Sequence, residues 1–347
     1  LMVLSHLNHF KQITSEKIMP SYDVMPDVQL FQPTEVDDAV SLANQYKEDG
    51  WILGGGQDTY GWLKDRAKNP KALIDINGVD SLRGIRQIEN GIEIGSTTTL
   101  LEIIKNPIIN NSFSLLSDAA ERVASPQIRN VGTLGGNLIQ DTRCWYYRRG
   151  LACYRAGGNL CYADGPEAMN REHALFNASR CVAVSASDTA TALMALDANM
   201  IAISIDGKRS IPVEDFFVGP DTHITKMTSL EPGEILSTIH IPAKWSNANF
   251  YFEKIADRDV WDFALVSIAV AMNTENKKIV DSRFVFGGVA ATPYRVKHIE
   301  NTANGKNLSE KTGEDLAKLA SEGAKPLKYN RFKLPLMENL LRRAIRG

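Results

Sequence analysis

The sequence predicts an α+β fold, with short strands and helices mixed along most of the chain and long strands followed by helices at its end. Apolar residues recur at helical spacing in residues 35–46, whereas residues 91–95 alternate as a strand does. Near the C-terminus, a helical pattern beginning at about residue 295 follows three segments with the character of buried strands, residues 251–256, 262–273 and 279–289. A chain of 347 residues is long enough for two domains, or three small ones.

The remaining elements are expected from local patterns. Thr34 is expected to cap the helix at 35–46, whose first turn carries Asp37 and Asp38 where the helix dipole favours acidic groups. Ser187 and Asp188 are expected to begin a further helix. Other strands are expected at 51–53, 72–76 and 182–184 and within 200–240, and other helices at 100–105 and 114–123.

Composition excludes several classes of protein. Hydrophobic residues make up 44% and charged residues 23%, as in an ordinary globular protein, and a net charge of -2 gives no basic surface for nucleic acid. The longest apolar runs, such as residues 263–272, are too short to span a membrane. Residues 1–27 lack the basic region and cleavage site of a signal peptide, so we interpret them as an N-terminal extension. A cytoplasmic location is the default expectation, with export inside a complex as the alternative.

Two glycine clusters are candidate phosphate-binding loops. Residues 54–59 read GGGQDT and residues 132–137 read GTLGGN, which we call the first and second glycine loops. Glycines allow backbone N–H groups to approach a phosphate because no Cβ is in the way. Neither loop has a complete nucleotide fingerprint, since Thr59 stands where a dinucleotide-binding loop has its third glycine. Tight turns are the alternative for each loop alone, but two such loops together favour a diphosphate cofactor.

All four cysteines lie in one stretch, with the spacing C-x8-C-x7-C-x19-C; they are Cys144, Cys153, Cys161 and Cys181. We call residues 141–181 the cysteine segment and expect it to be a long loop. The pairs of closely spaced cysteines that mark ferredoxins and zinc ribbons are absent from the sequence. From the residues alone, an iron–sulfur cluster, a zinc ion, and free thiols or disulfides all stay open. The six histidines are scattered and are expected to have structural or surface roles.

Several motifs, in order along the chain, resemble the flavin subunits of the molybdenum hydroxylases, the family that includes xanthine dehydrogenase and carbon monoxide dehydrogenase. Residues 52–59 (ILGGGQDT) resemble the family's first pyrophosphate loop, and residues 125–138 (SPQIRNVGTLGGNL) resemble its flavin signature. Ser187-Asp188 resembles a later pair that contacts the cofactor. Residues 287–295 resemble part of the C-terminal domain.

The resemblance implies a two-subdomain FAD-binding domain of the vanillyl-alcohol-oxidase type, residues 28–244 divided near residue 85. A smaller α/β domain of the CO dehydrogenase flavoprotein type would follow at 245–347. It implies an oxidoreductase subunit that binds FAD and passes electrons between a small [2Fe-2S] subunit and an external donor or acceptor, such as ferredoxin, while a large partner subunit holds molybdopterin. No catalytic residue is expected on this chain. The implied cofactor-binding residues are Ile52, Leu53, Gly54, Gly55, Gly56, Gln57, Asp58, Thr59, Ser96, Thr97, Ile128, Asn130, Gly132, Thr133, Gly135, Gly136, Asn137 and Asp188.

One departure from the family pattern concerns the cysteine segment. In most relatives the Ser-Asp pair comes shortly after the Gly-Gly-Asn signature, but here residues 141–181 intervene. This resembles the flavin subunits of 4-hydroxybenzoyl-CoA reductase and the bacterial aldehyde oxidoreductase trimer, which carry a [4Fe-4S] cluster on an insertion at this place. The resemblance therefore implies that the four cysteines ligate such a cluster. The alternatives are a stand-alone flavin oxidase and a flavoprotein whose cysteine loop binds zinc.

Overall fold

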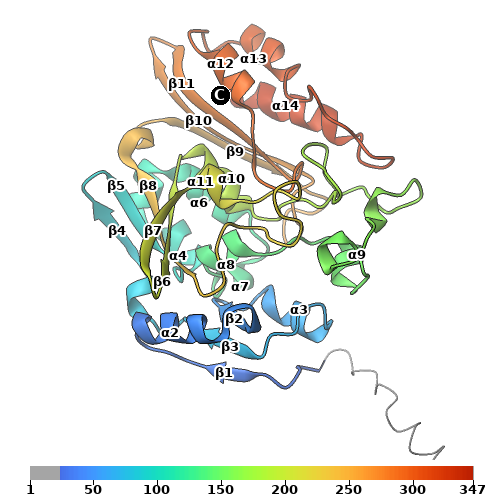
Figure 1. Cartoon of the computed structure of the whole chain (residues 1–347). Coiled ribbons are helices and arrows are strands. Elements are labelled where there is room, and N and C mark those ends of the chain that lie inside the picture. The colour runs from blue at the N-terminus through green and yellow to red at the C-terminus, as the bar shows by residue number, and fades with distance from the viewer. Residues whose placement is uncertain (1–23, 347) are drawn as a thin grey trace, which may run out of the picture.

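The computed structural model describes residues 24–346, and within this range the strands form three sheets (Figure 1). The expected N-terminal extension therefore lies almost wholly outside the described residues. The three sheets follow one another along the chain and stack from the bottom to the top of Figure 1. The predicted α+β class is confirmed.

The first sheet is small and parallel, with strand order β1-β3-β2. Its strands are β1 (Gln29–Phe31), β2 (Gly50–Leu53) and β3 (Ala72–Asp75), and the crossovers that parallel strands require contain α2 (Val36–Tyr46) and α3 (Thr59–Lys64). The expectation that Thr34 caps α2 is wrong, because Glu35 occupies the N-cap position and no side chain makes a capping bond. Asp37 and Asp38 lie in the first turn as predicted.

The second sheet has five strands in the order β4-β5-β8-β6-β7, and its paired strands are antiparallel. Their bounds are Ile85–Ile88 (β4), Gly91–Gly95 (β5), Asn199–Ser204 (β6), Gly207–Pro212 (β7) and Ile235–Pro242 (β8). Helices pack against this sheet around one large apolar core. They are α4 (Leu100–Lys105), α5 (Pro107–Ser112), α6 (Ser114–Glu121), α8 (Leu134–Ile139), α10 (Asp188–Ala195) and α11 (Val213–Phe216). The short helix α7 (Pro126–Arg129) follows α6 and has no buried residue.

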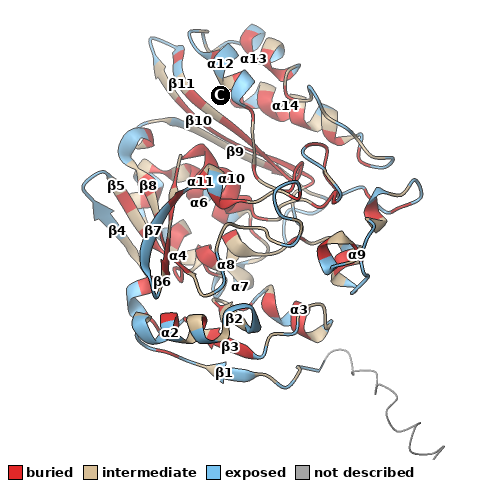
Figure 2. Cartoon of the chain, viewed as in Figure 1, coloured by how far each residue is buried: buried red, intermediate tan, exposed pale blue. Residues whose placement is uncertain are grey.

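The third sheet, order β12-β11-β10-β9, carries the C-terminal helices on one face. Its strands are β9 (Asn249–Ile255), β10 (Val266–Glu275), β11 (Lys278–Gly287) and β12 (Tyr294–Arg295), and the helices are α12 (Lys297–Ala303), α13 (Glu310–Ala317) and α14 (Lys333–Arg346). Figure 2 shows β10 almost entirely buried, because α14 covers it on one side and α10 on the other. The outer strand β7 of the second sheet is by contrast mostly exposed.

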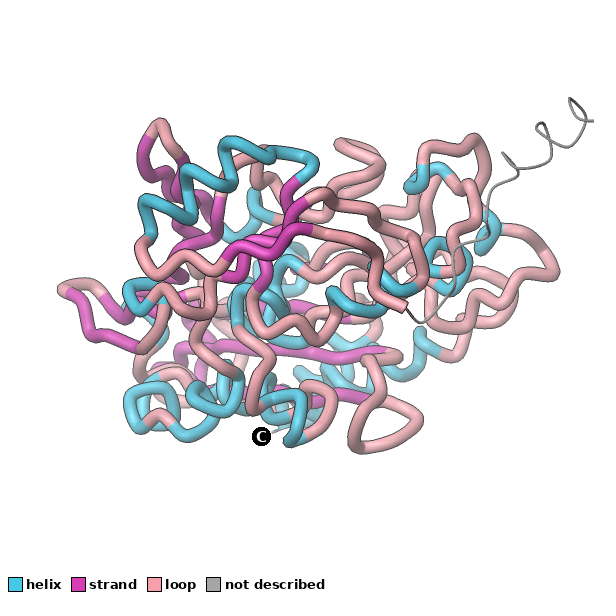
Figure 3. The backbone as a smooth tube through the Cα atoms, turned by 90° about the horizontal axis from the view of Figure 1, so that it is seen from below, coloured by secondary structure: helices cyan, strands magenta, loops and turns pink. Residues whose placement is uncertain are grey.

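The cysteine segment projects from one side of the molecule, next to α3 (Figure 1). It is mainly loop, as predicted, with one short helix, α9 (Trp145–Arg148), and two single turns, η3 (Tyr154–Ala156) and η4 (Tyr162–Asp164). Figure 3, which views the molecule from below, shows that loops form much of the side that carries the cysteine segment. The remaining single turns are η1 (Lys47–Asp49), η2 (Asp80–Leu82) and η5 (Ala243–Trp245). Across the described residues, no helix combines the length and the apolar character needed to cross a membrane.

Candidate cofactor site

The two glycine loops pack directly against each other and form one wall of a cavity of about 710 Å³. A Cβ added at Gly55 would lie 2.1 Å from the carbonyl oxygen of Val131, and one added at Gly135 would lie 2.8 Å from Cβ of Ser96. Both distances are shorter than a carbon atom can tolerate, so glycine is needed at position 55 for the contact between the loops and at position 135 for the contact with Ser96. A volume of this size is typical of a cofactor pocket.

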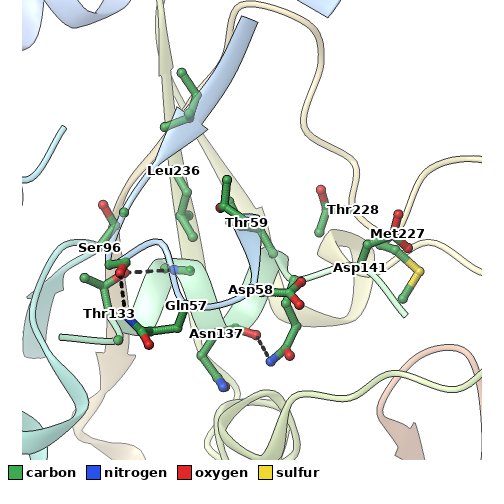
Figure 4. A pocket seen from close by; sticks show the side chains of 18 of the residues that line it. Gln57, Asp58, Thr59, Ser96, Thr133, Asn137, Asp141, Met227, Thr228 and Leu236 are labelled. Atoms are coloured by element: carbon green, nitrogen blue, oxygen red, sulfur yellow. Dashed lines mark hydrogen bonds between the residues drawn. The ribbon is translucent and has the colours of Figure 1, made fainter. Parts of the chain in front are cut away.

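Nearly all of the residues implied to bind a cofactor line this cavity; the exceptions are Leu53 and Asn130. Leu53 is buried in the protein and Asn130 is exposed. Figure 4 shows side chains from both glycine loops, with Ser96 beside them, around the same space. The hydroxyl of Ser96 is buried and has no hydrogen-bond partner among the described residues. A buried polar group of this kind normally has a partner, so the unpaired hydroxyl fits a cavity that holds a polar ligand.

A network of polar side chains connects the second glycine loop to the start of α10. The amide oxygen of Asn137 accepts hydrogen bonds from Ser187 Oγ at 2.7 Å and from Thr189 Oγ1 at 2.6 Å. Ser187 also caps α10, as predicted, by accepting a bond from the Ala190 N–H. Asn137 is therefore held in place by protein groups, and its amide nitrogen faces no partner in the described structure.

Asp188 lines the cavity and forms a buried ion pair with Lys254. Its carboxylate lies 2.6 Å from Lys254 Nζ, which also donates to the Arg122 carbonyl at 2.9 Å. The side chains of Lys254 and Asp188 are only 3% and 5% exposed. Burial raises the pKa of Asp188, and the lysine opposes that shift. Sequence analysis did not identify Lys254 as a site residue. The one feature that could have indicated it is that a lysine stands in a strand of mainly apolar residues.

Asp58 lines the cavity too, but its carboxylate already has protein partners. Oδ1 forms ion pairs with Arg143 and with Arg148, the latter at 2.9 Å. Oδ2 accepts a hydrogen bond from Trp62 Nε1 at 2.9 Å. Both arginines belong to the cysteine segment, so this one side chain joins the first glycine loop to that segment.

Further residues of the cavity come from regions that the sequence did not mark as a site. The loop before β8 contributes residues 226–228 and 230–234, the start of β8 contributes residues 235–236, and the turn before β10 contributes residues 261–263. Trp261 has φ of 79°, a conformation unfavourable for a large side chain, and its N–H donates to the Ala124 carbonyl at 2.8 Å. It lies where the cavity adjoins a second one, of about 700 Å³. Arg258 and Asp262, beside this turn, form an ion pair at 2.5 Å.

The four cysteines are all free thiols. Cys144, Cys161 and Cys181 lie close enough for their charges to interact. Cys153 packs against Trp62 and Tyr147, and Cys144 packs against the same cluster. No group of three or more His, Cys, Asp or Glu side chains in residues 24–346 is arranged to hold a metal ion. The four thiols are therefore not arranged as the ligands of a metal ion in the described structure.

Two of the four thiols lie in surroundings that disfavour their ionised form. Burial raises the pKa of Cys144 to about 11 and also raises the pKa of Cys161. His173 Nε2 lies 3.3 Å from Cys144 Sγ, and burial, helped by the nearby Lys333 ammonium, lowers the pKa of His173 to about 4. The thiols of Cys144 and Cys161 are therefore protonated at neutral pH.

Two family models together match almost the whole described chain. The FAD binding domain in molybdopterin dehydrogenase matches residues 26–244, and the CO dehydrogenase flavoprotein C-terminal domain matches residues 251–347. The chain belongs to the FAD-binding medium subunits of the molybdenum hydroxylase family.

Individual relatives agree with this assignment. The chain is 33% identical over 254 residues to the aldehyde oxidoreductase FAD-binding subunit PaoB of Escherichia coli, covering 71% of this chain and 76% of that protein. It is 27% identical to the carbon monoxide dehydrogenase medium chain of Hydrogenophaga pseudoflava, covering 93% and 97%. A solved structure of carbon monoxide dehydrogenase from H. pseudoflava superposes with a TM-score of 0.74 at 25% identity, covering 93% of this chain and 97% of that one.

The family assignment confirms the expected fold class and explains where the cavity lies. Every residue of the two glycine loops falls inside the matched FAD-binding domain of this medium subunit, and so do the four cysteines. Lys254 and Trp261 come instead from the matched C-terminal domain. The cavity of this medium subunit is therefore built mainly by its FAD-binding domain and closed by residues of the second domain.

Proposed function

We propose that this medium subunit is the electron-transfer subunit of a molybdenum hydroxylase complex and that its FAD lies in the cavity that the two glycine loops line. The observation that carries the proposal is that these loops, both inside the matched FAD-binding domain, meet along one cavity. FAD supplies the ability to exchange electrons singly or in pairs. The partners are a small [2Fe-2S] subunit, a large molybdopterin subunit and an external donor or acceptor.

The protein's own contribution is to hold and orient the cofactor. The backbone of the first glycine loop, residues 54–59, and that of the second, residues 132–137, are the groups that we expect to face the diphosphate. The unpaired Ser96 hydroxyl and the free amide nitrogen of Asn137 are available as further donors. Residues 261–263 narrow the cavity from the C-terminal domain and limit the access of water.

Two measurements test this function. Denaturation of the purified protein is expected to release FAD and not FMN, because the paired loops suit a diphosphate that FMN lacks. The native complex is expected to be a heterotrimer, or a dimer of heterotrimers, with a sizeable buried interface. Release of FMN, or a native mass of this chain alone with full substrate turnover, would contradict the proposal and favour a stand-alone flavin enzyme.

We also propose that the cysteine segment carries a [4Fe-4S] cluster ligated by Cys144, Cys153, Cys161 and Cys181. Four thiolates suffice for such a cluster, and three of these thiols already lie within electrostatic reach of one another. Cys153 lies in the apolar cluster against which Cys144 packs, and binding of iron by the four thiols would be coupled to ordering of the segment. The four thiols are free of disulfides, as they would be in the cytoplasm.

A buried guanidinium gives independent support for an anionic group in the segment. Arg155, two residues from Cys153, is 3% exposed. Its Nε and Nη2 have no hydrogen-bond partner in the described part of the chain. Its Nη1 is 3.5 Å from Asp141 Oδ1 and donates to the Thr225 carbonyl oxygen at 3.5 Å. A buried charge with so few partners is unfavourable. An anionic cluster beside it would supply the missing interaction.

The cluster is tested by iron and acid-labile sulfide analysis and by EPR of the reduced protein prepared without oxygen. About four irons per chain are expected. Each Cys→Ser change should leave a three-iron or empty site while FAD is largely retained, because the glycine loops lie outside the segment. Ser179→Ala, near Cys181, is a matched control that should keep the iron. One zinc per chain without iron, or disulfides among the four cysteines, would refute the cluster.

A further inference from the structure

Asp58 occupies a position between the two parts of the molecule to which the preceding sections assign cofactors. It belongs to the first glycine loop and lines the cavity. Its carboxylate nevertheless points to partners outside that loop: Arg143 and Arg148, which flank Cys144 in sequence, and the indole N–H of Trp62. A carboxylate that accepts from two guanidinium groups and an indole has little capacity left for a cofactor hydroxyl.

The contact is partly shielded from water and forms part of a packed cluster. The side chains of Asp58 and Arg148 are 22% and 14% exposed, so the ion pair is screened less than one on the surface. The Arg148 guanidinium lies over the Trp62 ring, 4.0 Å from its centroid, and the Trp62 and Tyr147 rings are 5.1 Å apart. Cys153 completes this apolar cluster. Through Arg143, just before α9, and Arg148, its last residue, the Asp58 carboxylate holds the helix against the first glycine loop. The apolar cluster that contains Cys153 is held there with it.

We propose that Asp58 is a positioning residue that couples cofactor binding in the cavity to the order of the cysteine segment. A cofactor that fixes the first glycine loop also fixes the Asp58 carboxylate. The segment anchored to that carboxylate then opens less often. Because binding free energies are linked reciprocally, ordering of the segment strengthens cofactor binding by the same factor. The inference rests on the proposal that the cavity holds FAD, and it assigns Asp58 a role toward the segment that this proposal does not contain.

Hydrogen–deuterium exchange of the full-length chain, with and without saturating FAD, tests the coupling. FAD is expected to slow exchange in peptides covering residues 143–156 by about fivefold or more, the lower end of ordinary coupling energies. In Asp58→Asn this protection should fall to less than about twofold. The affinity for FAD should fall by the same factor by which the protection decreases. Asp58→Glu, which keeps the charge, should retain part of the protection.

Two controls separate coupling from simple damage to the fold. Asp65→Asn removes an exposed carboxylate at the end of α3 that forms no ion pair with a described residue, and it should leave protection unchanged. Arg148→Gln removes the other side of the contact and should reproduce Asp58→Asn, while the double variant adds little further loss. Exchange in β10 and β11 should be the same in all variants, which shows that the fold is intact.

The outcomes distinguish this inference from the proposed function. If the wild-type chain binds FAD but residues 143–156 gain no protection, the coupling is refuted and the flavin site stands. Equal protection in wild type and Asp58→Asn would likewise overturn the role of Asp58. If the wild-type chain does not bind FAD at all, the proposed function fails and the coupling fails with it.

Discussion

The buried pair of Asp188 and Lys254 leads to a quantitative prediction about stability. Lys254→Met keeps the length of the side chain but removes its charge, so the Asp188 carboxylate and the Arg122 carbonyl both lose their donor. The two side chains are 3% and 5% exposed, which leaves almost no solvent to replace the lost contact. Removing one member of a buried pair costs about 3–5 kcal/mol. We expect a loss of that size in the free energy of unfolding at pH 8.

The pH dependence follows from the protonation of Asp188. Burial already raises its pKa, and without Lys254 the pKa rises further. A carboxyl with a raised pKa in the folded state contributes stability that is present below the unfolded pKa of about 4 and is lost as pH rises through the folded value. The difference between wild type and Lys254→Met should therefore be smaller at pH 5 than at pH 8.

Urea unfolding of the FAD-free full-length chain at both pH values measures this difference. The double variant Asp188→Asn, Lys254→Met removes both charges of the pair and should recover most of the lost stability. The reasoning is refuted if Lys254→Met loses less than about 1 kcal/mol at pH 8, or if the loss is the same at pH 5.

Three further predictions concern other parts of the molecule. Gly55→Ala places a Cβ 2.1 Å from the Val131 carbonyl oxygen and should weaken FAD binding about tenfold or more. The control Gly78→Ala, whose Cβ has its closest contact at 3.4 Å, should not weaken it. Equal affinities of the two variants in a fluorescence titration would contradict this prediction. Burial lowers the pKa of Lys333 to about 7, so its contribution to stability is present above the unfolded pKa and is lost as pH falls through 7. Urea midpoints should rise between pH 7 and pH 9 by the equivalent of about 2 kcal/mol, and Lys333→Met should abolish that rise. Ser187→Ala removes both the cap of α10 and a bond to Asn137 and should lower thermal stability by about 1–2 kcal/mol, a loss that an unchanged melting temperature would disprove.

Local signals allowed much of the fold to be predicted. The helix expected at 100–105 is present with those bounds, since a capping box between Thr99 and Glu102 fixes its start. Helix α8 was missed because Gly135 and Gly136 lie inside it, and glycine is a poor helix former. The structure shows that Thr133 caps this helix, so the glycines serve close packing and not merely a turn.

The site could be predicted only as far as its residues are local or resemble a family motif. The glycine loops were found this way, and in the structure both line one cavity. Contacts between distant segments carry no local signal, and these include Lys254 with Asp188 and the arginines with Asp58. The sequence explained Gly55 only by the close approach of a phosphate. In the structure a Cβ at this position would also collide with Val131 and Gly132, where the second glycine loop begins.

The way the cysteine segment ends has a consequence for how such an insertion is gained or lost in evolution. Lys333 Nζ donates to the His173 carbonyl at 3.0 Å and to the Gly288 carbonyl at 2.7 Å, and the Asn330 amide donates to the carbonyls of His173 and Ala174. Both donors are fully buried. Deleting residues 141–181 would leave a buried cation and a buried amide short of acceptors in the C-terminal domain. A shortened descendant would therefore need changes at positions 330 and 333, so sequences of relatives with and without the segment should differ together at these distant sites.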